Sequence, residues 1–195
     1  YGDMARVYVA GGHVKAADLL LLRASRMNST DVNCRQALAW LAMSQGRVFE
    51  SIRWLQELSE LRPADFTYPQ EIARLYAQAD QIDETLATLD RFLQDHPDSA
   101  EANRALANYF LDVAPDSEKA IQYALEAARL APTADSYAML ATIYSEVEKT
   151  ADAIAALERA ITLDPKNTQL RQMLALMRAP ASLSSPSEGD RATKR

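Results

Sequence analysis

Apolar residues along the chain recur at intervals of three and four positions, as they do in residues 137–144, YAMLATIY. That spacing places them on one face of a helix. Strand-like alternation is nearly absent, glycine is scarce at five residues, and Ala, Leu, Glu, Gln and Arg are abundant. These side chains lose little freedom in a helix, so the pattern predicts an all-α fold.

An eight-residue pattern returns every 34 residues. The octets start at residues 1, 35, 69, 103 and 137 and read YGDMARVY, RQALAWLA, PQEIARLY, NRALANYF and YAMLATIY. Each octet has a large apolar residue at its fourth position and alanine at its fifth. The eighth position is aromatic except in the second octet, which has Ala42. We expect Trp40 or Trp54 to supply the missing volume, and the sequence leaves both open.

A second element follows each octet and carries apolar or small residues with helical spacing. In the last copy it reads ADAIAALERAITLDP, with Ala153, Leu157 and Ala160 at the matching positions and Pro165 at its end. Proline suits a site just past a helix because it cannot continue the helix. The fourth copy has one extra residue in its internal turn, where Pro115 is expected to break the helix.

These motifs resemble the tetratricopeptide repeat, whose pattern W-x2-L-G-x2-Y, A-x3-F, alanine and proline spans 34 residues. The resemblance implies an all-α, right-handed superhelical solenoid of about five helical hairpins. A single hairpin cannot bury its own apolar face, whereas stacked hairpins can. The predicted hairpins are 1–31, 32–65, 66–99, 100–133 and 134–167, followed by a capping helix over 168–179 and a disordered tail over 180–195, rich in Pro and Ser.

Composition narrows the classes of partner. The net charge of −6 disfavours phosphate backbones, so nucleic acid is not an expected partner. No stretch reaches the roughly 18 apolar residues of a membrane span. The single cysteine, Cys34, allows no intramolecular disulfide and no multi-thiolate metal site. A cytoplasmic and a periplasmic location both remain open.

Candidate catalytic groups do not converge. His13 and His96 lie more than two repeats apart, and Asp95 beside His96 is the nearest approach to an acid–base pair. We interpret His96 as a solvated loop histidine. No phosphate-binding loop, HExxH motif or nucleophile elbow is present. The sequence therefore predicts no enzyme, no cofactor and no metal site.

The resemblance implies that first helices line a concave groove. Octet positions two, six and nine share a helical face that points away from positions four, five and eight, which we expect to be buried. The candidate peptide-binding residues on this face, which we call the predicted strip, are Arg6, Gln36, Trp40, Met43, Gln70, Arg74, Arg104, Asn108 and Thr142. Arginine can donate to carboxylates and tryptophan can stack, whereas the alternative interpretation is an ordinary solvated face. The arginines favour a ligand with an acidic or amide-rich segment along the middle of the groove.

The leading hypothesis is a non-catalytic adaptor or scaffold that binds a protein or peptide segment. The Arg to Lys ratio of 16 to 5 favours a bacterial source, with envelope or secretion assembly as the setting. The first octet lacks its leading residues, so sequence upstream is expected. The chain is alternatively the accessory region of a larger enzyme, such as a glycosyltransferase or protease. A third hypothesis is self-association through the Leu19–Leu22 face, together with Trp54, or through the repeat ends.

Overall fold

The computed structural model describes residues 1–28 and 30–178, and within these residues it contains helices and turns but no strand. The predicted all-α fold is confirmed. The helices are α1 (Gly2–Ala10), α2 (Val14–Met27), α3 (Val32–Ser44), α4 (Val48–Leu61), α5 (Thr67–Gln78), α6 (Ile82–Asp95), α7 (Ala100–Asn108), the π-helical segment η1 (Tyr109–Val113), α8 (Ser117–Leu130), α9 (Ala134–Glu146), α10 (Thr150–Leu163) and α11 (Thr168–Arg178).

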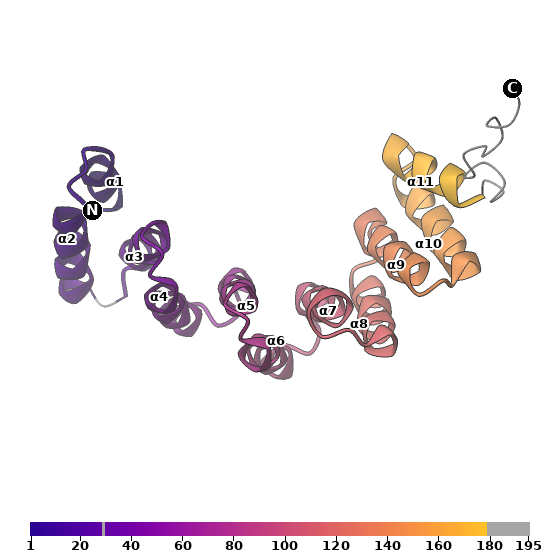
Figure 1. The fold of residues 1–195 in the computed structure, drawn as a ribbon, viewed down its shortest axis with the longest axis horizontal. Helices are drawn as coiled ribbons and strands as arrows, with labels where there is room; N and C mark the ends of the chain where they lie inside the picture. Colours follow the sequence, from indigo (N-terminus) through magenta and orange to yellow (C-terminus); the bar gives the residue numbers. More distant parts are fainter. Residues whose placement is uncertain (29, 179–195) are drawn as a thin grey trace, which may run out of the picture. The chain divides into compact units, whose positions relative to one another are not determined.

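The chain divides into two compact units, the first comprising residues 1–132 and the second beginning at Thr133. In the first unit each α-helix packs on its neighbours in sequence, from α1 through α8. The odd-numbered helices of this unit lie along one side of the row and the even-numbered helices along the other (Figure 1). We call the surface formed by α1, α3, α5 and α7 the first-helix face. In the second unit α10 packs on both α9 and α11.

Burial follows the 34-residue period most closely in the second helix of each hairpin. Three positions are buried in all five copies. They are Ala17, Leu21 and Ala24; Ser51, Leu55 and Leu58; Thr85, Leu89 and Phe92; Ala120, Ala124 and Ala127; and Ala153, Leu157 and Ala160. Small residues at the first of these positions allow the two helices of a hairpin to approach closely.

Two hydroxyls occupy this small position without leaving a buried polar group unpaired. Ser51 Oγ donates to the carbonyl oxygen of Ala39 at 3.0 Å. Thr85 Oγ1 lies 3.4 Å from the carbonyl oxygen of Ala73 and donates to that of Gln81 at 2.8 Å. Ala39 and Ala73 each stand at the fifth octet position of the same hairpin. The hydroxyls therefore replace alanine at no cost in unsatisfied hydrogen bonds.

The turn inside a hairpin also has a repeated conformation. Gly12, Gly46, Asp80 and Glu148 all have positive φ, between 58° and 78°. The next residue donates its N–H to the carbonyl oxygen at the eighth octet position, as in Arg47 to Ala42 at 2.9 Å. Glycine favours this left-handed conformation because it has no Cβ.

The fourth hairpin accommodates its extra residue in η1. The N–H of Ala114 donates to the carbonyl oxygen of Tyr109 at 3.0 Å, and that of Asp116 donates to Phe110 at 2.7 Å. Ala114 has a φ of −129°, as expected for a residue before proline, so no left-handed residue is needed. The predicted break at Pro115 is confirmed, and the inserted residue widens the last helical turn.

Two expectations for the first hairpin are wrong. Met4 and Tyr8 occupy octet positions expected to be buried, but both are exposed. The physical reason is that a solenoid residue is buried only when a neighbouring helix covers it.

In the second unit, α11 lies where a capping helix was predicted and packs on α10. Residues 179–195, including the predicted disordered tail, lie outside the described residues.

Candidate functional site

A groove on the first-helix face lies between α1 and α3. It has a volume of about 420 Å³ and is lined by Tyr1, Gly2, Asp3, Arg6, Asn33, Gln36, Ala37 and Trp40. Small residues form its floor, since a Cβ placed on Gly2 would lie 3.8 Å from the Cβ of Ala37. The groove thus brings together Arg6, Gln36 and Trp40, three residues of the predicted strip.

The two tryptophans of the second hairpin lie in different environments. Trp40 is 44% exposed in the groove, whereas Trp54 is 6% exposed and belongs to the hydrophobic core. Of the two candidates for the missing core volume, Trp54 is therefore the one that lies in the core. Its burial also removes Trp54 from the proposed Leu-rich docking face. On that face Leu19 is exposed, while Leu20 and Leu22 are half-buried.

Gln36 links the groove to the next hairpin. Its Nε2 donates to the hydroxyl of Tyr68 at 3.1 Å, and Tyr68 is itself buried at the start of α5. This contact holds the Gln36 side chain in one orientation beside Trp40. Asn33, which sequence reasoning missed, lines the same groove. Its spacing of three before Gln36 and seven before Trp40 is the helical pattern that could have identified it.

The arginines along the strip are not equivalent. The Arg74 guanidinium makes a two-point ion pair with Glu71, with Nε and Oε2 2.8 Å apart. The hydrogen bond from Arg74 holds the pKa of Glu71 below its usual value. The negative charge of Glu71 therefore offsets the positive charge of Arg74 that the sequence predicted at the middle of the strip. Arg104 and Asn108 lie exposed on α7 in the same unit.

Met43 and Thr142, two further predicted residues, do not line the groove. Met43 is half-buried and packs against the core, so the ninth octet position does not lie fully on the first-helix face. Thr142 lies in α9, in the second unit, and its Oγ1 donates to the carbonyl oxygen of Ala138 at 3.1 Å.

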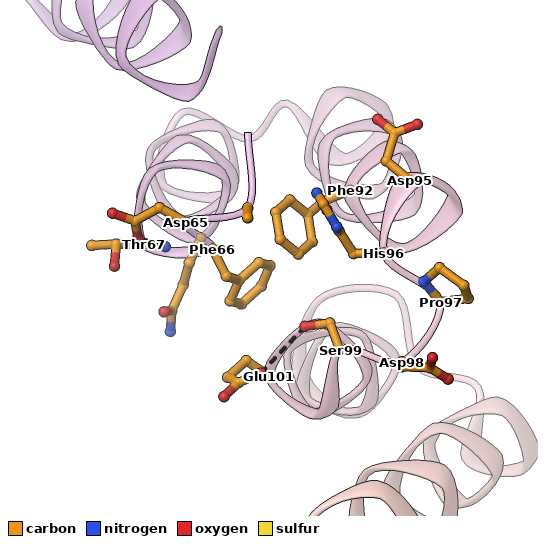
Figure 2. A pocket seen from close by; sticks show the side chains of 12 residues that line it. Asp65, Phe66, Thr67, Phe92, Asp95, His96, Pro97, Asp98, Ser99 and Glu101 are labelled. Carbon is orange, nitrogen blue, oxygen red and sulfur yellow. Dashed lines mark hydrogen bonds between the residues drawn. The ribbon is translucent and has the colours of Figure 1, made fainter. Parts of the chain in front are cut away.

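A larger pocket, of about 650 Å³, opens where the loops before α5 and α7 meet. Figure 2 shows Phe66 and Phe92 at its centre, with ring centroids 4.9 Å apart. Gln70 of the predicted strip lines this pocket. The pocket also contains Asp65, Asp95, Asp98 and Glu101, whose carboxylates point in different directions (Figure 2). Sequence reasoning missed this pocket because Phe66 lies in a loop to which the repeat pattern assigns no role.

His96 is a structural residue of this pocket rather than the solvated loop histidine expected from the sequence. Its Nε2 lies 2.8 Å from the carbonyl oxygen of Pro63, and its ring packs against Phe92 with centroids 4.5 Å apart. The Asp95 carboxylate points away from the His96 ring (Figure 2). The two residues therefore do not form the acid–base pair that their adjacency suggested.

Cys34 is buried at the start of α3, where its thiol donates to Asp31 Oδ2 at 3.1 Å. Burial, aided by the hydrogen bond and charge of Asp31, raises the pKa of the Cys34 thiol to about 11. A thiol that stays protonated is a weak nucleophile and a poor metal ligand. Within the described ranges, no group of His, Cys, Asp and Glu could hold a metal ion, and no helix is long and apolar enough to cross a bilayer.

Comparison with known families accounts for this arrangement. A tetratricopeptide repeat family model matches residues 71–135, and a second model of the same repeat matches residues 134–167. The chain is a tetratricopeptide repeat protein. The matched ranges fall within the third to fifth predicted repeats of this tetratricopeptide repeat protein. The second helices of its first two repeats bury the same three positions as those of the later repeats. No curated protein matches the chain in sequence.

Solved structures of several other proteins share the fold, and two of the three that follow, TTC0263 and YrrB, are described as tetratricopeptide repeat proteins. TTC0263 of Thermus thermophilus is 19% identical, with a TM-score of 0.62 over 90% of this chain and 95% of its own. MamA of Desulfovibrio magneticus is 16% identical, with a TM-score of 0.61 over 85% and 94%. YrrB, described as having an unusual peptide-binding site, is 15% identical, with a TM-score of 0.57 over 89% and 87%. At these identities the similarity establishes the fold alone.

Proposed function

We propose that this chain is a non-catalytic interaction module that binds a peptide or partner segment along the first-helix face of residues 1–132. The groove between α1 and α3 is its main anchoring site. Tetratricopeptide repeats are generally interaction modules, so a protein or peptide partner is the expectation for the fold. The observation that carries the proposal is the exposed Trp40 ring beside Arg6 in a preformed groove.

The chemistry of the groove indicates what it would hold. Its volume of about 420 Å³ lies within the usual range of roughly 300–1,000 Å³ for ligand pockets. Trp40 offers a flat apolar surface for an aliphatic or aromatic side chain. Arg6 can donate to a carboxylate or a peptide carbonyl, and Asn33 can both donate to and accept from a peptide backbone. The ligand of this proposal therefore has a large apolar residue next to an acidic or amide-bearing one.

The neighbouring residues extend this site along the face. Gln36 is already held by Tyr68, so it presents a fixed amide rather than a mobile one. Arg104 and Asn108 on α7 and Gln70 on α5 add further polar groups in the same unit. Pairing with Glu71 makes Arg74 a weaker contributor than the sequence suggested. The proposed order of importance is Trp40 first, then Arg6, then the amides.

A selection experiment tests this proposal even though the partner is unidentified. Random peptides displayed on phage would be selected against the full chain, and the dissociation constants of recovered peptides would be measured by fluorescence anisotropy. We expect Trp40→Ala to weaken binding at least tenfold, because exposed tryptophans in grooves act as hot spots. Arg6→Glu should weaken the binding of peptides that carry an acidic residue.

The chain offers matched controls for both variants. Phe49 is an exposed aromatic residue at the start of α4, and Arg23 is an exposed arginine on α2. Neither lines the groove between α1 and α3. Phe49→Ala and Arg23→Glu should therefore leave affinity unchanged. Selected peptides that bind Trp40→Ala and Phe49→Ala equally well would rule out the groove as the anchoring site.

For the biological setting, we propose a bacterial envelope or secretion assembly. The arginine-rich, lysine-poor composition supports a bacterial source, and a repeat scaffold suits an assembly of several proteins. Fractionation of cells that express the tagged full-length protein tests this setting. Recovery with envelope complexes is the expected result, and recovery solely as a free protein would contradict it.

A further inference from the structure

The pocket of about 650 Å³ where the loops before α5 and α7 meet contains an aromatic residue that the repeat does not require. Phe66 stands at the position where three other first helices begin with an aliphatic residue: Val32 in α3, Ala100 in α7 and Ala134 in α9. α5 begins one residue later than this pattern, at Thr67. Since the other hairpins form without an aromatic side chain at this position, Phe66 has a role other than building the repeat.

Phe66 belongs to a row of three rings in this pocket. Its centroid lies 4.9 Å from that of Phe92, and the centroid of Phe92 lies 4.5 Å from that of His96 (Figure 2). The carbonyl oxygen of Pro63 can only accept, so His96 Nε2, 2.8 Å away, donates to it and the ring is held in place. The faces of aromatic rings carry partial negative charge and attract cations.

The charged side chains that line the pocket are all acidic. Twelve residues line it, and they include no lysine or arginine but four carboxylates, those of Asp65, Asp95, Asp98 and Glu101. None of the four takes part in an ion pair with the described residues. Arg104 follows Glu101 by the three residues that separate Arg74 from Glu71, yet only the latter two are paired. The negative charge at the pocket is therefore not offset by an ion pair.

The arrangement of these carboxylates suits an organic cation rather than a metal ion. Asp65 comes from the loop before α5 and Glu101 from the first turn of α7, and the carboxylates point in different directions (Figure 2). A metal ion needs ligands that converge on one point, and no group of His, Cys, Asp and Glu in residues 1–28 and 30–178 does so. A guanidinium group instead stacks on aromatic rings and donates five N–H groups outward in its plane.

Two of the carboxylates keep an oxygen free for such a donor. Asp65 Oδ1 accepts from the N–H of Thr67 at 3.1 Å, and Glu101 Oε2 accepts from the hydroxyl of Ser99 at 3.3 Å. These hydrogen bonds orient both side chains. The second oxygen of each carboxylate has no hydrogen-bond partner among the described residues, so each can accept from a ligand.

We propose that this pocket binds the guanidinium group of an arginine residue in a partner polypeptide. The guanidinium stacks on Phe66 and donates to Asp65 and Glu101, as the aromatic ring and the charge of the pocket favour. The pocket volume exceeds that of a guanidinium group and leaves room for the neighbouring residues of a peptide. This pocket shares no lining residue with the groove between α1 and α3, so the proposal stands apart from the proposed function.

A short peptide with blocked ends, Gly-Gly-Arg-Gly-Gly, is the probe. It would be titrated into the ¹⁵N-labelled full chain and followed by NMR. We expect the amide signals of Phe66, Thr67, Ser99 and Glu101 to shift together and to saturate. The same peptide with citrulline in place of arginine keeps the shape and loses the charge. It should bind roughly tenfold more weakly, because charge-assisted hydrogen bonds are the stronger ones.

Protein variants with matched controls locate the site. Glu101→Gln should weaken the arginine peptide roughly threefold, as expected for an exposed charge pair. Its control is Glu118→Gln, because Glu118 is also exposed in the first turn of its helix, α8, and lies outside the pocket. Phe66→Leu keeps an apolar side chain but removes the aromatic face, so it should also weaken binding. Phe49→Leu, at an exposed phenylalanine outside the pocket, should not.

Several results would overturn the proposal. Equal affinity for the arginine and citrulline peptides would do so, as would equal effects of Glu101→Gln and Glu118→Gln. Free arginine that binds as tightly as the peptide would replace the polypeptide by a small molecule. Peptide binding that appears only after residues 191–195 are removed would show that the basic end of this chain, RATKR, is the occupant. Trp40→Ala should leave binding of the arginine peptide unchanged, so the groove can fail as a site without affecting this pocket.

Discussion

The second and fourth hairpins fill the same space with different side chains. At the eighth octet position the second hairpin has Ala42 and the fourth has Phe110. Three residues after the buried small residue of the second helix stand Trp54 in one and Tyr123 in the other. Phe110 and Tyr123 stack, with centroids 5.6 Å apart and planes at 2°. Trp54 therefore occupies the repeat position of Tyr123, and we expect it to supply the volume that Ala42 lacks.

The turns of these two hairpins also differ. The second hairpin reverses through Gly46 with a φ of 70°, whereas the fourth inserts one residue and forms η1. Both solutions place the second helix so that its small residue, Ser51 or Ala120, is fully buried. The comparison teaches that the repeat keeps the helix–helix register, and that the turn and the distribution of aromatic volume can vary around it.

Loss of the core tryptophan should have the largest effect. Trp54→Ala is expected to lower the free energy of unfolding by about 3–5 kcal/mol, because Ala42 leaves nothing to fill the cavity. Tyr123→Ala should cost less, about 1–2 kcal/mol, since Tyr123 is half-buried and Phe110 remains. Urea unfolding of the full chain, followed by circular dichroism, measures both.

A double-mutant cycle sharpens this test. Ala42→Phe alone should destabilise by about 1–3 kcal/mol through overpacking against Trp54. In the Trp54→Ala background the same substitution should instead restore stability, which gives a favourable coupling energy. If the two losses simply add, Trp54 does not occupy the space beside position 42.

The turn of the second hairpin should be more stable with glycine, and the matching turn of the fourth hairpin should be more stable with alanine. Gly46→Ala is expected to cost about 1–2 kcal/mol, because alanine is disfavoured at positive φ. Nothing lies within 4 Å of the added Cβ, so the cost comes from the backbone alone. Ala114→Gly, at the matching place in the fourth hairpin, should instead cost about 0.5–1 kcal/mol by making the unfolded chain more flexible. Thermal unfolding that shows Ala114→Gly to be stabilising would mean that this turn also prefers a left-handed residue.

The helix caps of the two hairpins should be nearly equivalent. Asp31 accepts from the N–H of Cys34 at 3.2 Å, and Ser99 accepts from that of Ala102 at 3.1 Å. Asp31→Ala and Ser99→Ala should each cost about 1 kcal/mol in urea unfolding. Gln81 precedes α6 without a capping side-chain hydrogen bond, so Gln81→Ala serves as the control and should change stability by less than about 0.5 kcal/mol. A cost for Gln81→Ala equal to that of the other two would show that the capping bonds are not the cause.

The smallest expected effect is a pH-dependent change in stability caused by Cys34, whose counterpart in the fourth hairpin is Ala102. The thiol pKa is raised from 9.0 to about 11 by burial first and by Asp31 second. The fold therefore favours the protonated thiol, and this contribution to stability is complete below pH 9 and lost as the pH rises toward 11. Urea unfolding at pH 8 and pH 10 should show a smaller pH-dependent loss for Cys34→Ala than for the wild type. Equal losses would mean that Cys34 does not titrate with folding.

The predictable part of the candidate site follows from helical periodicity. Octet positions two and six placed Arg6, Gln36 and Trp40 on one surface, and the structure brings these three residues to one groove. The ninth position packs against the core, as Met43 shows, although seven residues return a helix to nearly the same face. Its burial depends on the neighbouring helices and not on helical spacing alone. The ion pair of Arg74 with Glu71 could have been predicted from the sequence, because side chains three residues apart meet on a helix surface.

The sequence by itself determined the helical hairpins, their 34-residue period and the face of each second helix that is buried. These features depend on local backbone hydrogen bonds and on side-chain spacing along one helix, and the order of the residues determines both. Only the tertiary structure decided that Trp54 is in the core and Trp40 in the groove, that His96 packs on Phe92, and that Met4 is exposed. Burial depends on which neighbouring helix supplies or lacks a covering surface, and no single segment of the chain contains that information.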